Sequence, residues 1–216
     1  MKICLIPARS GSKRIKNKNI KLFFGKPMIA FAIENAKKTK LFDKIIVSTD
    51  SKKIAKISSR FGAEIPFFRP KKLADDKTVD KTVINHFLKN FKQRISYLCY
   101  LYPNSPLLKT STIVKSFNQI SKKNYQQLIT ICKNKSDPNR VFKLEKNNVV
   151  KILKKRKKYS KKSNFFNDAG QCYWFNLNKN VKKKILGFPI SKYEGIDINT
   201  YEDLKLVKIL YSKKNI

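Results

Sequence analysis

Short apolar runs alternate with helix-like segments along the first 132 residues, and this order constrains the fold of the chain more than any other feature. The runs are continuous, as in strands that are buried on both faces of a sheet, and lie at residues 3–8, 44–48, 97–102 and 127–132. Between them, apolar residues recur at helical spacing after Pro27, Ser51 and Asp80 and over residues 112–121. This βαβα order predicts an α/β fold with a mostly parallel sheet and helices on both of its faces.

The pattern changes after residue 137. Apolar and polar residues alternate around Lys146, Asn147 and Asn148, which predicts a β-hairpin, and residues 171–177 have the composition of a further strand. Thr200 is the expected N-cap of a final helix. Because no repeat, linker or compositional break interrupts the chain, we expect a single domain over residues 1–216 with a hairpin extension at about residues 140–165.

The net charge of +36 suggests a phosphate-bearing partner such as a nucleic acid. However, most of the cations are lysines spread along the whole chain, whereas nucleic-acid readers favour arginine and stacked aromatic side chains. The dense block at residues 154–162 is a nucleic-acid patch on one interpretation and a solvated hairpin or loop on the other, which we favour. A basic nucleic-acid-binding protein without catalysis is therefore the alternative function, and we expect no specific nucleic acid partner.

The cysteines and the hydropathy indicate the compartment. The four cysteines are widely separated and form no CxxC pair, which argues against a disulfide scaffold and a zinc site. No apolar run approaches the length of a membrane span, and the first residues do not resemble a signal peptide. We expect a cytoplasmic protein with no membrane partner.

The loop LIPARSGSKRIKNKN at residues 5–19 follows the first predicted strand. Right-handed crossovers place such loops along one rim of the sheet, where α/β proteins bind phosphate-bearing ligands. Its small residues let the backbone approach an anion, and its cations can neutralise several phosphate charges; they are Ser10, Gly11, Ser12, Arg9, Lys13, Arg14 and Lys18. The loop matches neither GxxxxGK[ST] nor GxGxxG.

The string IPARSGSKRIKNKNI resembles the signature of the CMP-nonulosonic acid synthetases, which reads approximately IPARGGSKxxxxKNI. The resemblance continues in order through GKPMIAFAIENA, IIVSTDSKKIA, GAEIPFFRPKKLADD, SPLL and IDINTYEDL. The most similar branch is that of the pseudaminic acid cytidylyltransferases, which share SKRI and a DAGQ-aromatic-YW stretch matching residues 168–174. The resemblance implies a Rossmann-like nucleotidyltransferase fold, a three-layer α/β/α sandwich.

The same resemblance implies a reaction and its partners. In the family, the anomeric hydroxyl of a nonulosonic acid attacks the α-phosphate of CTP, and pyrophosphate is released with the help of Mg²⁺. Pseudaminic acid is the expected substrate; N-acetylneuraminic and legionaminic acids are the alternatives. Residues 102–106 read YPNSP where the sialic acid branch reads QPTSP, and the loss of the glutamine weakens the case for that substrate. A homodimer is also implied, with residues 143–162 as the exchange hairpin.

Site residues are carried over from the family position by position. Arg9, Ser12 and Lys18 match residues that grip the triphosphate, Asn19 and Arg69 match residues near the cytidine, and Asp76 matches a recurrent acid. The expected CTP site is Ala8, Arg9, Ser10, Gly11, Ser12, Lys13, Lys18, Asn19, Arg69 and Asp76. The expected sugar site is Tyr102, Asn104, Ser105, Asp168, Gln171 and Tyr173. Arg9, Lys18 and Asp197 are the expected catalytic residues.

The family usually reads IDIDT where this chain reads IDINT, so Asp197 and Asn199 are the expected Mg²⁺ ligands. In an extended segment they share one side, and Asn199 offers an oxygen without a negative charge. Alternatives remain for several acids: Asp197 as a helix cap, Asp50 as a helix cap or as a residue near the nucleotide, and Asp75 and Asp76 as turn residues. His86, the only histidine, is expected to pack or to face solvent and not to act as a base.

Overall fold

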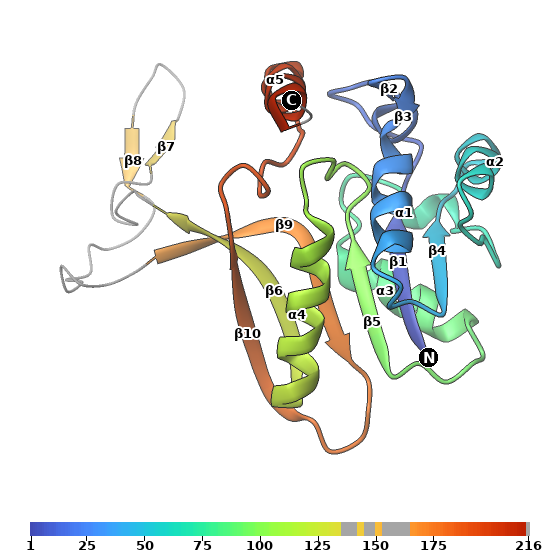
Figure 1. The fold of residues 1–216 in the computed structure, drawn as a ribbon. Coiled ribbons are helices and arrows are strands. Elements are labelled where there is room, and N and C mark those ends of the chain that lie inside the picture. Colours follow the sequence, from blue (N-terminus) through green and yellow to red (C-terminus); the bar gives the residue numbers. More distant parts are fainter. Residues whose placement is uncertain (135–141, 145–149, 153–164, 215–216) are drawn as a thin grey trace.

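The computed structural model of the protein describes residues 1–134, 142–144, 150–152 and 165–214. Six strands form one sheet in the order β10-β6-β9-β5-β1-β4 (Figure 1). Their bounds are β1 (Lys2–Pro7), β4 (Lys44–Ser48), β5 (Tyr97–Leu101), β6 (Tyr125–Asn134), β9 (Phe165–Asn176) and β10 (Lys182–Ile190). The pairs β1–β4, β1–β5 and β6–β10 are parallel, which confirms the predicted mostly parallel sheet.

Strand β9 is the exception, because it lies between β5 and β6 and runs antiparallel to both. The chain therefore places a strand from its C-terminal part in the middle of the sheet. Alternation of apolar residues predicts that β9 exists but carries no information about its neighbours. The predicted run at residues 171–177 covers only the second half of this strand, which begins at Phe165.

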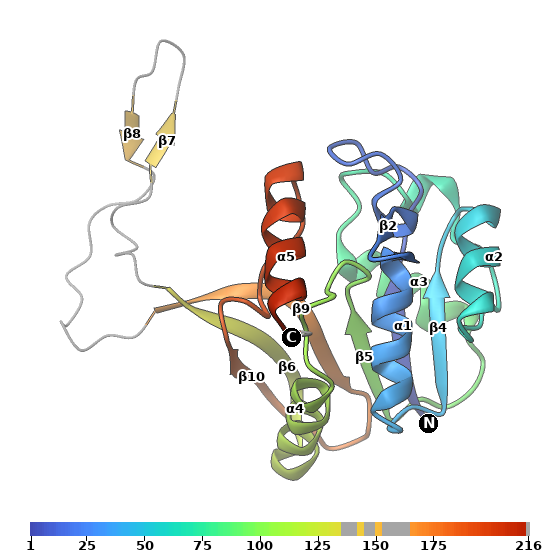
Figure 2. The ribbon, with the colours of Figure 1, turned by 45° about the horizontal axis from the view of Figure 1, so that its top comes forward.

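Helices cover both faces of the sheet (Figures 1 and 2). Their bounds are α1 (Met28–Lys38), α2 (Lys52–Arg60), α3 (Asp80–Asn90), α4 (Thr110–Lys123) and α5 (Tyr201–Lys214). Apolar residues of α1, α2 and α4 pack on one face of the sheet around Trp174, whose ring stacks on Phe42 with centroids 5.5 Å apart. Helix α3 packs on the opposite face through Val83, Ile84 and Phe87. These two layers confirm the predicted α/β/α arrangement.

Helix α5 belongs to a third apolar cluster, in which Leu204 and Val207 pack with Ile15, Phe23 and Met28. Ile15 lies in the loop after β1. Phe23 lies in the short strand β2 (Leu22–Phe23), which pairs with β3 (Lys26–Pro27). The C-terminal helix thus packs against the segment that follows the first strand.

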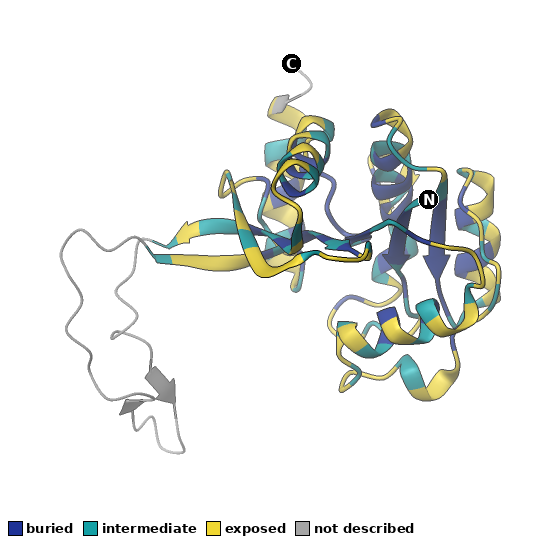
Figure 3. Ribbon diagram, turned by 90° about the horizontal axis from the view of Figure 1, so that it is seen from below, coloured by how far each residue is buried: buried dark blue, intermediate teal, exposed yellow. Residues whose placement is uncertain are grey.

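Strand β10 was not predicted from the sequence, because its lysines, Gly187 and Pro189 interrupt the apolar pattern. The strand nevertheless pairs with β6 from Lys182 to Ile190. A Cβ atom on Gly187 would lie 2.5 Å from Cδ1 of Ile131, so any other residue at this position would force the end of the Ile131 side chain to shift. Strand β10 and the first part of β9 carry exposed residues, whereas β1, β4 and β5 are largely buried (Figure 3).

The predicted hairpin is present as β7 (Phe142–Leu144), which pairs antiparallel with β8 (Val150–Ile152). The basic block at residues 154–162 lies outside the described residues. No helix in the described ranges is both long and apolar enough to cross a membrane.

Candidate functional site

A cavity of about 240 Å³ opens at the carboxyl ends of β1 and β5. It is bounded by the loop after β1, the segment leading into α3, the segment after β5 and the segment before α5. The predicted site residues that line it are Arg9, Ser12, Lys13, Lys18, Asn19, Arg69, Asp76, Tyr102, Asn104 and Asn199. Beside this cavity, hydrogen bonds join Asn104 to Asp197 and Arg14 to Asn199, which are 93 and 185 positions apart in the sequence.

The loop after β1 is held in shape by neighbouring elements. Ser10 donates from its backbone N–H to Asp50 at 2.9 Å and from its hydroxyl at 2.5 Å. Asn19 is buried, and its amide donates to the carbonyl of Arg9 at 2.9 Å. Asp50 therefore braces the loop, while the hydroxyl of Ser51 caps α2 by accepting from the N–H of Ile54 at 3.3 Å, so the interpretation of Asp50 as the cap is wrong.

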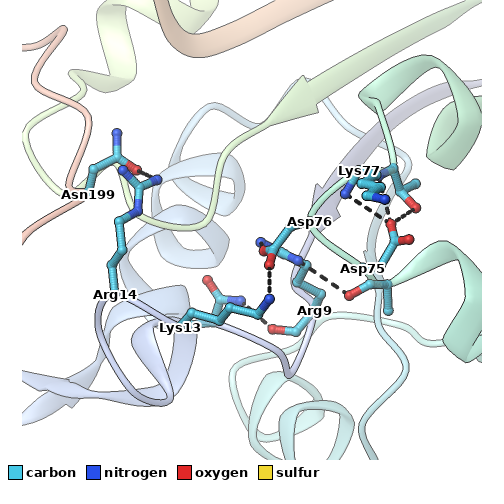
Figure 4. Close-up of polar contacts among 10 residues, drawn as sticks. Arg9, Lys13, Arg14, Asp75, Asp76, Lys77 and Asn199 are labelled. Atoms are coloured by element: carbon cyan, nitrogen blue, oxygen red, sulfur yellow. Dashed lines mark hydrogen bonds and ion pairs between the residues drawn. The ribbon is translucent and has the colours of Figure 1, made fainter. Parts of the chain in front are cut away.

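Two cations of the loop converge on one carboxylate (Figure 4). Arg9 and Lys13 both form ion pairs with Asp76, the latter at 2.6 Å. Hydrogen bonds from Lys13 and Arg9 lower the pKa of Asp76 to about 2, so its charge persists at any working pH. Arg9 also donates to the carbonyl of Ala74 at 3.4 Å. Asp75 instead caps the next turn by accepting from the N–H groups of Lys77 and Thr78, as its turn interpretation predicts.

The other two cations contact the segment before α5. Arg14 donates to Oδ1 of Asn199 at 2.7 Å, and Lys18 donates to the carbonyl of Ile198 at 2.6 Å. Burial lowers the pKa of the Lys18 ammonium, an effect that the nearby Asp197 opposes. The loop thus aims two cations at Asp76 on one side and two at the segment of residues 197–199 on the other.

The segment of residues 197–199 is itself ordered by amides. Asn104 donates to Oδ1 of Asp197 at 2.9 Å, and the amide of Asn199 donates to Oδ2. Asp203 accepts from the N–H groups of Asn199 and Thr200 at 2.9 and 2.7 Å, while the hydroxyl of Thr200 accepts from the N–H of Asp203. This reciprocal pair confirms Thr200 as the cap of α5, and the alternative that Asp197 is the cap is wrong.

Arg69 is a buried cation of the cavity, with an exposed fraction of 5%. Its Nε and Nη2 atoms have no hydrogen-bond partner among the residues that the structure describes. Burial lowers the pKa of the guanidinium, and Tyr100, Asp50 and Asp80 oppose that effect. Because unpaired buried donors are costly, this arrangement is suited to a ligand that supplies acceptors.

The remaining predicted sugar-site residues surround the end of β5 without lining the cavity. The hydroxyl of Ser105 donates to the carbonyl of Tyr102 at 2.6 Å. Gln171 is buried, accepts from the N–H of Tyr102 through its backbone carbonyl, and donates from its amide to the carbonyls of Ala169 and Ile196 at 3.1 and 3.3 Å. The predicted residues outside the lining are Ala8, Ser10, Gly11, Ser105, Asp168, Gln171, Tyr173 and Asp197.

Asp168 and Tyr173 pair with each other. The hydroxyl of Tyr173 donates to the carboxylate of Asp168 at 2.8 Å, and its ring contacts that of Tyr102 edge-on with centroids 5.7 Å apart. Gly11 has no close contact that requires glycine, since a Cβ there would lie 3.7 Å from the carbonyl of Ala74.

Sequence reasoning missed Asp80, Tyr100 and Thr78, which also line the cavity. Asp80 begins a helix and Tyr100 lies in a strand, so both were assigned only to secondary structure. The available signal was their position, since each lies where an element meets the rim of the sheet. His86 is half-buried and packs edge-on against Phe67, as expected. Burial lowers its pKa.

Comparison with known proteins adds the decisive observation, because the family profile described as cytidylyltransferase matches residues 3–216. The chain belongs to the cytidylyltransferase family. It is 32% identical over 221 residues to a pseudaminic acid cytidylyltransferase of Campylobacter jejuni, an alignment that covers 97% of this chain and 95% of the relative. It is also 32% identical to a CMP-N,N'-diacetyllegionaminic acid synthase of Campylobacter jejuni, with 99% and 96% covered.

The fold of this cytidylyltransferase is shared with a solved structure of CMP:2-keto-3-deoxy-manno-octonic acid synthetase in complex with CTP. The two superpose with a TM-score of 0.73 at 14% identity, and 99% of each chain is covered. This likeness confirms the Rossmann-like nucleotidyltransferase fold.

Proposed function

We propose that this cytidylyltransferase transfers CMP from CTP to the anomeric hydroxyl of a nonulosonic acid, with pseudaminic acid as the substrate. The observation that carries the proposal is the cavity at the carboxyl edge of the sheet, lined by Arg9, Lys13, Arg14 and Lys18, in a member of the cytidylyltransferase family. The full-length similarity to a pseudaminic acid cytidylyltransferase supports the choice of sugar. N,N'-diacetyllegionaminic and N-acetylneuraminic acids are the alternatives within the family.

In this function the loop after β1 binds the triphosphate. Arg9 and Lys18 counter the charge on the phosphate oxygens as the anomeric hydroxyl attacks and pyrophosphate leaves, and Ser12 and Lys13 add donors. The two ion pairs to Asp76 keep Arg9 and Lys13 aimed into the cavity before CTP arrives. Such preorganisation lowers the cost of ordering charged side chains in the transition state.

The base end of CTP is assigned to Asn19 and Arg69. The unpaired Nε and Nη2 donors of Arg69 match the carbonyl and ring nitrogen of cytosine, both of which are acceptors. The amide of Asn19 already donates to the carbonyl of Arg9, so its role is to hold the loop against the base. The sugar is assigned to Tyr102, Asn104 and Ser105, which follow β5, and to the β9 residues Asp168, Gln171 and Tyr173. Tyr102 contacts Gln171 and Tyr173, and Tyr173 donates to Asp168.

A Mg²⁺ ion is proposed at Asp197 and Asn199. Among the residues that the structure describes, no three His, Cys, Asp or Glu side chains gather as a metal site, so the ion needs phosphate oxygens and water as further ligands. The carboxylate of Asp197 and the amide of Asn199 lie on neighbouring side chains, and the amide oxygen would bind the ion only after Arg14 releases it. When bound, the ion polarises the phosphates of CTP. Asn104 orients Asp197 through its 2.9 Å hydrogen bond.

Pyrophosphate release tests the proposed function. Purified protein is given CTP and Mg²⁺ with pseudaminic, N,N'-diacetyllegionaminic or N-acetylneuraminic acid, one sugar at a time. We expect the highest kcat/KM with pseudaminic acid, and CTP replaced by UTP or ATP should be a poor donor. Absence of turnover with all three sugars would contradict the enzymatic function.

We also propose a homodimer, which is supported by the exposed apolar residues Phe166 and Ile185 on strands β9 and β10. Light scattering coupled to gel filtration measures the mass directly, and a monomer at micromolar concentration would contradict the proposal. We place the enzyme in the cytoplasm, which is consistent with the buried thiols of Cys4, Cys99 and Cys172.

A further inference from the structure

Asp80 binds two tyrosine hydroxyls at once. The hydroxyl of Tyr100 donates to its Oδ1 at 2.8 Å, and the hydroxyl of Tyr102 donates to its Oδ2. Asp80 is the first residue of α3, whereas the tyrosines lie at the end of β5 and directly after it. All three residues line the cavity, so the two hydrogen bonds join separate elements within one wall.

This arrangement fixes the direction of both phenol protons. A phenol has one proton to donate, and an ionised carboxylate can only accept. Once that proton points to Asp80, the oxygen has only lone pairs left for a ligand. Burial and the hydrogen bond to Asp80 raise the pKa of Tyr102 far above its usual range, so the phenol keeps its proton at any working pH.

The charges around the wall support the same conclusion. Asp80 carries a negative charge beside the cavity, and Arg69 is the cation whose pKa it influences. The loop cations lie on other walls, where they pair with Asp76, Asn199 and the carbonyl of Ile198. The tyrosine wall thus presents a carboxylate and a phenol oxygen with the Arg69 guanidinium nearby, whereas the loop presents four cations to an anionic group.

We propose that Asp80 is a positioning residue that fixes the hydroxyl of Tyr102 as a hydrogen-bond acceptor, so that this wall of the cavity takes a neutral hydrogen-bond donor, either a hydroxyl or an amide N–H. Tyr100 is fully buried, and its hydroxyl only holds Asp80 in place. The inference rests on the proposed function in one respect. It assumes that the hydrogen-bond donor belongs to the sugar acid and that the phosphates of CTP bind at the loop after β1. A sugar that carries hydroxyl and acylamino groups supplies both kinds of donor.

A purely structural role for Asp80 is the alternative. In that case the two hydrogen bonds only tie α3 to β5, and their loss weakens the fold and affects both substrates alike. The positioning role instead predicts a separation between the sugar and CTP, because only the sugar contacts the tyrosine wall.

Steady-state kinetics of three variants separates the two roles. Asp80→Asn gives one phenol an amide donor in place of an acceptor, so that phenol can turn its own proton toward the cavity. Tyr102→Phe removes the acceptor and leaves the charge of Asp80 in place. We expect each variant to raise KM for the sugar about tenfold, the size of one lost hydrogen bond, with KM for CTP changed less than about twofold.

The double variant Asp80→Asn/Tyr102→Phe should be no worse than Tyr102→Phe by more than about twofold, because without the Tyr102 hydroxyl Asp80→Asn has no ligand-facing oxygen left to reorient. Asp43→Asn is the matched control, since Asp43 accepts from the N–H of Lys2 and does not line the cavity. Equal increases in both KM values, or additive losses in the double variant, would overturn the positioning role. If Asp80→Asn does not fold, Tyr102→Phe still separates the two roles. A higher KM for the sugar alone supports the positioning role, and equal increases in both KM values support the structural role.

A measurement without turnover separates this inference from the proposed function. In protein labelled with ¹³C at the tyrosine ζ carbon, Asp80→Asn should shift the signals of Tyr100 and Tyr102 and leave that of the exposed Tyr193 unchanged. Unchanged signals for Tyr100 and Tyr102 would overturn the inference. Shifted signals in an enzyme that turns over none of the three sugars would support the fixed hydroxyls and contradict the proposed function.

Discussion

Arg14 donates a hydrogen bond of 2.7 Å to Oδ1 of Asn199, and this contact joins the loop after β1 to the segment before α5 across 185 residues of sequence (Figure 4). The amide of Asn199 donates in turn to Asp197, which also accepts from Asn104. The amide oxygen that could bind a metal therefore already has a cationic partner. This relationship determines what an added charge at position 199 should do.

Asn199→Asp should preserve turnover and lower the Mg²⁺ concentration that gives half-maximal rate, because a second carboxylate attracts the ion. The gain should be limited by Arg14, which would form an ion pair with the new carboxylate. Arg14→Gln/Asn199→Asp should therefore lower the Mg²⁺ requirement further than Asn199→Asp alone. Magnesium titrations of the initial rate measure both effects, and an unchanged or raised requirement in Asn199→Asp would contradict a metal at this position.

Asp197→Ala should reduce kcat by roughly 10²–10³-fold, the loss typical of one preorganised electrostatic group, at every Mg²⁺ concentration. Glu34→Gln is the matched control, since the carboxylate of Glu34 pairs with Lys26 and does not line the cavity. The control should leave both kcat and the Mg²⁺ requirement unchanged. Near-normal activity of Asp197→Ala would remove Asp197 from the active site.

Lys13→Ala should raise the pKa of Asp76 from about 2 toward the usual carboxyl value of about 3.9, because Lys13 is its main stabilising partner. The pKa of Asp76 is lower in the folded state than in the unfolded state, so folding is favoured when this carboxyl is ionised. The ion pair stabilises the fold above the unfolded pKa, and this contribution is lost as the pH falls through about 2. A ¹³C titration of the Asp76 carboxyl measures the change, and Lys16→Ala, on an exposed side chain, is the control.

Gln171→Ala should raise KM for the sugar more than KM for CTP and should also lower the melting temperature. Its amide holds the carbonyls of Ala169 and Ile196, and removing it leaves both without that donor. The expected loss of stability is about 1–3 kcal/mol. Thermal unfolding and two-substrate kinetics on the same preparation test the prediction. Equal changes in both KM values would indicate that Gln171 supports the fold alone.

Much of the fold followed from local pattern. The apolar runs of β1, β4, β5 and β6 and the helical spacing between them were enough to predict a mostly parallel sheet, because burial on both faces leaves continuous apolar strands. The right-handed crossover then placed the loop after β1 at the ligand-binding rim without any knowledge of side-chain contacts. Because the loop follows the first strand directly in the sequence, its small residues and cations could be identified without the structure.

Only the tertiary structure decided which residues meet. Periodicity does not order strands, so the antiparallel insertion of β9 between β5 and β6 could not be foreseen. The contacts of Arg14 with Asn199 and of Asp80 with Tyr100 and Tyr102 depend on that order and on where α3 and α5 begin. The sequence determined which chemical groups lie along the rim, and the packing of distant segments determined which of them share a wall of the cavity.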